Sequence, residues 1–155
     1  MKKEIRHLTD TPTVNTSAYA SGDTLGSLIT FSNALIPGCT GSAIIESCFV
    51  TSLSSAFTID VVFFSSNPSS TTFTNNAALD IADADLSKIC AVVQLDKTVS
   101  FADNAAIFPS NEDTVHWPIV LSDQETLYAV MVSRGTPTLG GTSDITLHVG
   151  LVQYI

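Results

Sequence analysis

The sequence has few charged residues, and very few of them are basic. Only 14% of its 155 residues are charged, and six lysines and arginines stand against 15 aspartates and glutamates, for a net charge of −9. A body this acidic repels phosphate backbones and anionic lipid headgroups. We therefore expect neither nucleic acid nor a membrane as a partner.

Long apolar runs and cysteine pairs are also missing. No run approaches the roughly 18 apolar residues of a membrane-spanning helix. The basic start, MKKEIRHLTD, is followed by TPTVNTS rather than by the apolar stretch of a secretory signal. Cys39, Cys48 and Cys90 form no CxxC pair, so neither a disulfide framework nor a zinc site is expected. Cys48 and Cys90 lie in apolar runs and should be small buried core residues.

The apolar and small polar residues that remain indicate a β-protein of one domain. Apolar residues make up 45% of the chain, and the uncharged polar residues are mostly Ser, Thr and Asn, which suit strand faces and turns. About eight strand-length runs are separated by turn residues at the spacing of a sandwich. We predict a β-sandwich, specifically a jelly roll, over residues 18–155, preceded by an N-terminal arm over residues 1–17.

Two neighbouring runs, residues 42–53 and 56–66, are separated by Ser54-Ser55 and predict a β-hairpin. Neither has a clean polar face, so both strands should be covered on both sides. Residues 125–134 alternate as a central strand does, and residues 71–74 suggest a short edge strand. Pro118 marks residues 114–121 as an edge or bulged strand.

The closing strand places four apolar side chains on one face and His148 on the other. Those four are Ile145, Leu147, Val149 and Leu151.

One short helix is predicted around residues 76–89. Asn75 or Asn76 is a candidate N-cap, and Asp83 is a candidate cap for a final single turn. Asp80, Asp83 and Asp85 could supply oxygen ligands to calcium, but the glycine and distal glutamate of an EF-hand loop are missing. Helix capping is the preferred interpretation, and whether an ion binds at residues 80–85 stays open.

No catalytic constellation stands out. The chain has no GxSxG elbow and no phosphate-binding loop with its lysine. His7, His116 and His148 are not spaced for zinc and have no visible nucleophile. Asp103 and Glu112-Asp113 lie in polar loops. We expect no enzyme, no cofactor and no metal, and a hydrolase on a β-sandwich is the weakest alternative.

Three stretches resemble a family of small structural proteins of tailed bacteriophages. They are AYASGDTLGSLITF, ending at Phe31, NPSSTTFTNNAALDIADADLSKICAVV over residues 67–93, and LYAVMVSRGTP over residues 127–137, which precedes the closing DITLHVGLVQ. The resemblance implies a virion protein, assembled in the host cytoplasm, that decorates the capsid surface as a cement protein. Its implied partners are the major capsid protein and further copies of itself, as a trimer.

The partner-binding residues are predicted mainly in the N-terminal arm. They are Lys2, Lys3, Ile5, Arg6, Leu8 and, elsewhere in the chain, Trp117. Arms of this kind can add an edge strand to a neighbour. The alternative is a carbohydrate- or receptor-binding module of a tail or head fibre, with exposed aromatics near Trp117 or the loop at residues 136–144.

Overall fold

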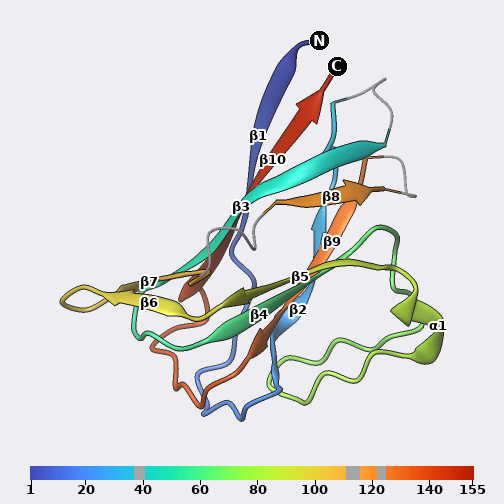
Figure 1. Cartoon of the computed structure of the whole chain (residues 1–155). Helices are drawn as coiled ribbons and strands as arrows, with labels where there is room; N and C mark the ends of the chain where they lie inside the picture. Colours follow the sequence, from blue (N-terminus) through green and yellow to red (C-terminus); the bar gives the residue numbers. More distant parts are fainter. Residues whose placement is uncertain (37–40, 111–115, 122–124) are drawn as a thin grey trace.

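The computed structural model describes residues 1–36, 41–110, 116–121 and 125–155, and it contains two antiparallel β-sheets packed together (Figure 1). The six-stranded sheet contains β1 (Lys3–Asp10), β3 (Ser42–Ser52), β6 (Lys97–Ser100), β7 (Ala105–Phe108), β8 (Trp117–Val120) and β10 (Ile145–Tyr154). The four-stranded sheet contains β2 (Thr24–Phe31), β4 (Ile59–Phe64), β5 (Ile89–Leu95) and β9 (Leu127–Ser133). The predicted all-β sandwich is confirmed.

The first four strands, β1 to β4, alternate between the two sheets. The larger sheet has the order β1-β10-β3-β7-β6, with β8 also paired to β3, and the smaller has the order β2-β9-β4-β5. The hairpin predicted between residues 42–53 and 56–66 is therefore wrong, because β3 and β4 lie in different sheets. The Ser52 hydroxyl accepts hydrogen bonds from the backbone N–H groups of Ser54 and Ser55, which turns the chain out of β3.

The core lies between the sheets and follows the period of two that strands impose. The four apolar residues predicted to share a face of the closing strand are all buried in it, opposite β4 and β9 residues such as Val61, Phe63 and Met131. Cys48 is buried, and Cys90 is half-buried against the core. Strand β9 lies between β2 and β4, so its predicted central position is confirmed. No helix in the described ranges is long and apolar enough to cross a membrane.

A bulge in β3 interrupts that period. Ser47 pairs with Gly150 while Ile45 pairs with Leu151, so Glu46 is the extra residue. The inward-facing residues consequently change from Ala43 and Ile45 to Cys48, Val50 and Ser52. A Cβ at Gly150 would meet the Ser47 hydroxyl, so a larger residue opposite the bulge would require the Ser47 side chain to move.

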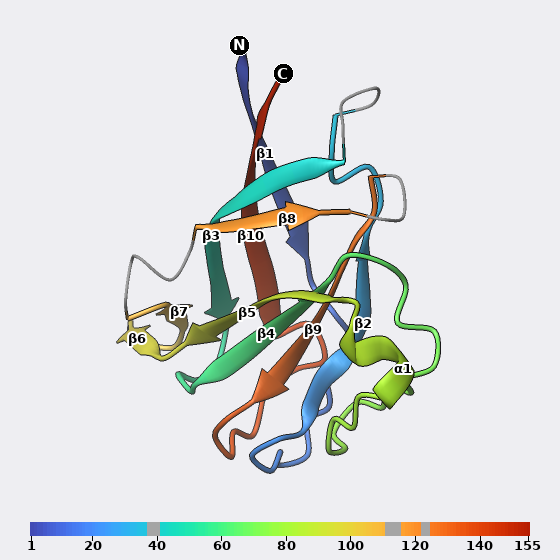
Figure 2. The same ribbon diagram turned by 45° about the vertical axis from the view of Figure 1, so that its right-hand side comes forward.

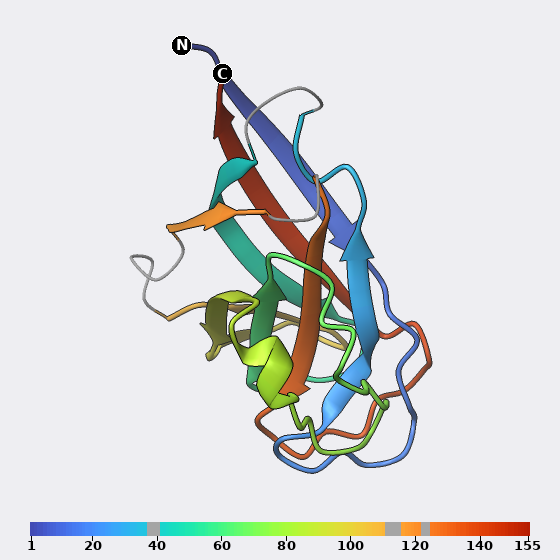
Figure 3. The ribbon, with the colours of Figure 1, turned by 90° about the vertical axis from the view of Figure 1, so that its right-hand side faces the viewer.

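The outer face of the four-stranded sheet is covered by the chain itself. Val62, Phe64 and Val130 are buried there beneath the segment between β4 and β5, and the Phe64 and Phe73 rings meet edge to face at 6.1 Å. Figure 3 shows this segment, with α1 (Asp83–Leu86), in front of the sheet. We call residues 65–88 the covering segment. Full burial of β4 confirms the prediction that it is covered on both sides.

The helix within the covering segment is a single turn, and its caps differ from those predicted. Its N-cap is Ala82, without a side-chain cap, and Asp83 is the first helical residue. Asn75 instead accepts hydrogen bonds from the Tyr19 hydroxyl and the Gly26 N–H, and Asn76 has a φ of 59°. Tertiary partners outcompete helix capping here.

The short strand expected at residues 71–74 does not form. The Thr71 hydroxyl donates to Asp85 instead.

Residues expected as part of an arm form an edge strand of the larger sheet. Strand β1 pairs with β10 without interruption from Lys3↔Tyr154 to Asp10↔Leu147, and the two termini lie side by side at its end (Figure 1). At the other side of the sheet, β8 pairs with β3 alone (Figure 2), so the edge position indicated by Pro118 is confirmed. Cys39, Glu112-Asp113 and the predicted start of the strand at Thr114 lie outside the described residues.

Candidate functional site

A row of aromatic rings crosses the outer face of the six-stranded sheet. The rings of His7 and His148 stack at 5.6 Å, those of His148 and Phe49 at 4.4 Å and those of Phe49 and Phe108 at 5.3 Å. These residues come from four adjacent strands, β1, β10, β3 and β7. We call the surface formed by His7, Phe49, Val99, Phe108 and His148 the ring face.

Strand register explains how residues distant in the sequence form this row. His148 pairs directly with Phe49, and directly opposed residues point to the same face of a sheet. Phe108 pairs with Lys97, and Val99 pairs with Ala106 on the same face. The bulge at Glu46 puts Phe49 on the outer face although Ala43 and Ile45 point inward. Sequence periodicity alone could not reveal this row, because it depends on pairing between distant strands.

His148 is held in its neutral form at the centre of the row. Burial, and then the neighbouring His7, lowers the pKa of His148 below its usual value. Its Nε2 lies 3.1 Å from the Thr51 hydroxyl, and its Nδ1 has no hydrogen-bond partner among the described residues. The ring therefore acts here as part of an aromatic surface.

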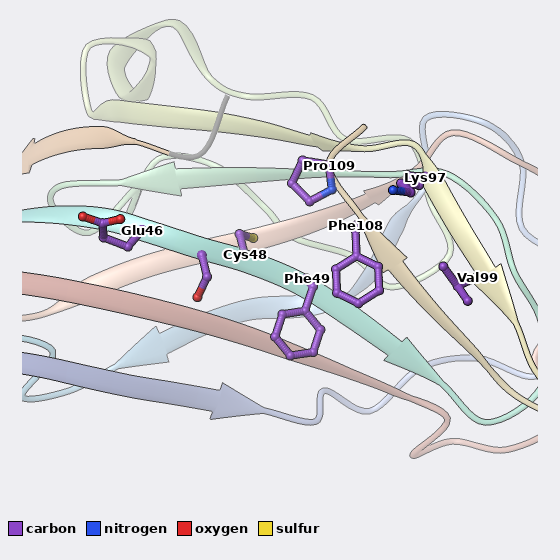
Figure 4. Close-up of a pocket in the computed structure, with 8 residues that line it drawn as sticks. Glu46, Cys48, Phe49, Lys97, Val99, Phe108 and Pro109 are labelled. Atoms are coloured by element: carbon purple, nitrogen blue, oxygen red, sulfur yellow. The ribbon is translucent and has the colours of Figure 1, made fainter. Parts of the chain in front are cut away.

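A hollow of about 540 Å³ adjoins the ring face. It lies along residues 46–49 of β3, which pair with neither neighbour. The pairing of β3 with β8 stops at Ile45, and its pairing with β7 starts at Val50. Figure 4 shows the Phe49 and Phe108 rings side by side, with Glu46 and Lys97 at opposite ends. The hollow thus combines an apolar wall with one carboxylate and one ammonium group, as small-molecule binding sites often do.

The predicted partner-binding residues lie on two different faces. Lys3 and Ile5 point outward on β1, on the same side as His7. Arg6 donates to the Leu35 carbonyl oxygen, and Leu8 packs against the core, so both point inward. Lys2 pairs with Glu4.

Trp117 is 40% exposed and pairs with Ile45, which places it on the inner side of the sheet margin. The six residues therefore do not form one site.

Buried carboxylates hold the loops rather than form a reactive group. Burial alone would raise the pKa of Asp85, but hydrogen bonds from Lys88, Thr71 and the Ser70 N–H outweigh it and hold the pKa below its usual range. Asp60 accepts a 2.7 Å hydrogen bond from Arg134. Asp80 and Asp103 are exposed.

Within the described ranges, no group of three or more His, Cys, Asp or Glu side chains could hold a metal ion. His116 lies 3.6 Å from Glu46 at the surface.

Comparison of the chain with protein-family models finds no match, and comparison with curated proteins finds none either.

Proposed function

We propose that this protein is a non-enzymatic structural component of a bacteriophage virion. In this proposal it decorates the capsid surface, binds the major capsid protein and copies of itself, and staples neighbouring capsid subunits. The observation that carries the proposal is the ring face, a surface of stacked rings and Val99 that no described segment of the chain covers. Three copies per assembly, as implied by the family resemblance, stay a prediction.

The distribution of exposed apolar residues supports an interface on the larger sheet. Among strand residues in the described ranges, five large hydrophobic side chains are exposed on the six-stranded sheet and one, Val92, on the four-stranded sheet. Ile5, Val99, Val120 and Tyr154 lie on the outer face of this sheet, and Trp117 lies on the inner side of its margin. Exposed apolar side chains gathered on one region mark association surfaces in soluble proteins.

Strand order supports the finer jelly-roll prediction. Successive strands from β1 to β4 alternate between the sheets, and β10 returns to lie between β1 and β3 while β9 lies between β2 and β4. Two interleaved Greek keys have this order, and the architecture is frequent among viral capsid proteins and lectins. This support is analogy at the level of fold.

Binding only to the assembled shell would stabilise it by linkage. A ligand that binds the assembled state and not the separated subunits favours assembly in proportion to the logarithm of its concentration over its Kd. No catalytic step is required, which agrees with carboxylates such as Asp60, Asp85 and Asp144 being engaged in structural hydrogen bonds.

The proposal is tested by capsid binding with matched surface variants. Val99→Lys places a charge on the ring face, whereas Leu86→Lys does the same at an exposed apolar residue of the covering segment. We expect the protein to be found in purified particles, Val99→Lys to bind undecorated shells at least about tenfold more weakly, and Leu86→Lys to bind as the wild type does. Absence from particles, together with no binding to shells, would overturn the proposal.

A carbohydrate- or receptor-binding virion module is the second candidate, and the hollow beside Phe49 and Phe108 favours it. Aromatic faces stack on the apolar faces of sugars, and Glu46, Ser47 and Lys97 supply hydrogen-bonding groups around them. This candidate predicts glycan-array binding that Phe108→Ala abolishes. A lack of any glycan binding by the folded wild type would remove it.

A further inference from the structure

The free edge of β1 is a regular template for strand pairing. Lys2 and Ile155 exchange both backbone hydrogen bonds, N to O, at 2.5 and 2.8 Å. Alternation along an antiparallel ladder then directs the backbone groups of even-numbered β1 residues toward β10. The N–H and C=O groups of Lys3, Ile5, His7 and Thr9 therefore point to the open edge, where no strand of the described residues pairs.

Natural sheets protect such edges with proline, bulges or charged side chains. Strand β1 contains no proline, and its pairing with β10 shows no bulge. It does carry charges, but they alternate in sign along the strand, from Lys3 and Glu4 to Arg6 and Asp10. A strand with this pattern can be complementary to its own antiparallel copy.

The charge pattern and the length of the hydrogen-bonded ladder together select one register for such a pair. Directly opposed residues must point to the same face, so the two-fold axis passes through a residue rather than between two. An axis at Glu4 opposes two glutamates, and an axis at Arg6 opposes two arginines. An axis at His7 opposes Glu4 to Asp10 of the other copy. An axis at Leu8 opposes Arg6 to Asp10 twice, but within β1 its hydrogen-bonded pairs are limited to His7 with Thr9. An axis at Ile5 opposes Glu4 to Arg6 twice and gives a longer hydrogen-bonded ladder, with Lys3 opposite His7 and the two Ile5 residues opposite each other.

We propose that β1 pairs antiparallel with β1 of a second copy of this chain, with Ile5 on the two-fold axis and Glu4 opposite Arg6 of the second copy. The odd-numbered residues form the hydrogen-bonded pairs of this ladder. Glu4 and Arg6 then form non-hydrogen-bonded pairs, which bring side chains closest.

The side chains needed for this pairing are accessible. Ile5 is 69% exposed on the ring-face side of the strand. The Glu4 side chain is 30% exposed and pairs with Lys2. Arg6 uses one N–H on the Leu35 carbonyl oxygen at 3.2 Å, and a guanidinium has five such donors, so others remain for Glu4 of the second copy.

The pairing joins the six-stranded sheets of two molecules into one continuous sheet, with both ring faces on the same side. Because the interface is isologous, it closes at two copies. A trimer would have to form through a different surface. The inference needs only a second copy of the chain and does not depend on the virion assignment.

Charge reversal in the full chain tests the register, with sedimentation velocity as the readout. We expect a wild-type dimer, and Glu4→Arg and Arg6→Glu should each weaken it about tenfold or more, because two attractive pairs become repulsive. The double variant should dimerise as the wild type does. An equimolar mixture of the two single variants should form heterodimers, because both cross-strand pairs are then opposite in charge.

Two further variants separate pairing from folding. Asp10→Lys changes net charge as Glu4→Arg does but lies beyond the paired segment, so dimerisation should be unchanged. Ile5→Pro removes an N–H that faces the open edge and not β10, so it should weaken the dimer while circular dichroism stays native.

A wild-type monomer at 100 µM, or single variants that self-associate as the wild type does, would each overturn the proposal. If the mixture of Glu4→Arg and Arg6→Glu formed no heterodimer, the register with Ile5 on the two-fold axis would be wrong. Shell binding by a monomeric protein would leave the proposed function intact while rejecting this pairing.

Discussion

On the outer face of the four-stranded sheet, Phe64 is buried beneath Phe73 of the covering segment, whereas on the outer face of the six-stranded sheet Phe49 stacks on Phe108 and both rings stay half-exposed. Both faces carry large apolar side chains, but residues 65–88 cover only the face of the four-stranded sheet. The covered face contributes to folding in the isolated molecule. The ring face gains a comparable contribution only when something else covers it.

The largest expected effect contrasts one phenylalanine from each face. Phe64→Ala should lower the free energy of unfolding by about 3–5 kcal/mol, because it opens a cavity under the covering segment. Phe49→Ala should cost about 1–2 kcal/mol, because that ring is only partly buried. Chemical denaturation followed by circular dichroism measures both. Equal losses would show that the two faces do not differ as described.

Removing the anchor of the covering segment should be the next largest effect. Asp85→Asn takes away the charge that accepts hydrogen bonds from Lys88, Thr71 and the Ser70 N–H, so the melting temperature at pH 7 should fall. The exposed Asp80→Asn is the matched control and should melt as the wild type does.

The pH dependence of that effect follows from the lowered pKa of Asp85. The contribution is present above the unfolded pKa of about 3.9 and is lost as the pH falls through the lower folded pKa. The difference in melting temperature between wild type and Asp85→Asn should therefore shrink in acid. A difference that stays constant from pH 7 to below pH 3 would contradict this account.

A smaller effect is expected on the ring face. Because the folded pKa of His148 is lowered, the unfolded chain binds a proton more readily, and stability falls as the pH drops below the unfolded value of about 6.5. His148→Phe should keep the stack with Phe49 and reduce the slope of melting temperature against pH between pH 7 and 5. An unchanged slope would mean that His148 does not carry this dependence.

The smallest difference is expected in the interior that the two sheets share, where cysteine thiols from both sheets should be protected from reagents. Burial raises the pKa of Cys90 to about 11 and raises that of Cys48 further. In a Cys39→Ser background, both thiols should react slowly with Ellman's reagent at pH 8 and fully in guanidinium chloride. Rapid labelling of Cys48 in the native protein would contradict its place in the core.

Local patterns predicted the strands well and their partners poorly. Alternation was sufficient to identify the central strand at residues 127–133 and the inward face of β10, because burial imposes a period of two. It could not assign β3 and β4 to different sheets, since a short polar connection suits a hairpin and a crossover alike. The bulge at Glu46 also hid the position of Phe49, since one extra residue reverses which side chains face outward.

The candidate site was largely inaccessible to sequence reasoning for the same reason. The ring row needs the pairing of β1, β10, β3 and β7, four segments separated by most of the chain. The predicted caps were wrong because Asn75 hydrogen-bonds to Tyr19 and Gly26, and because Asp83 is the first helical residue rather than the cap. Of the residues predicted to bind partners, Lys3 and Ile5 lie on the ring-face side of β1, and Arg6 and Leu8 lie on the opposite side. Alternation along that strand separates them.

Hydroxyl-radical footprinting of the protein, free in solution and bound to shells, tests the contrast between the two faces most directly. The account predicts that Phe49, Val99 and Phe108 become protected on binding, while Phe73 and Leu79 of the covering segment react equally in both states. Protection confined to the covering segment, with the ring face as reactive as in the free protein, would contradict it.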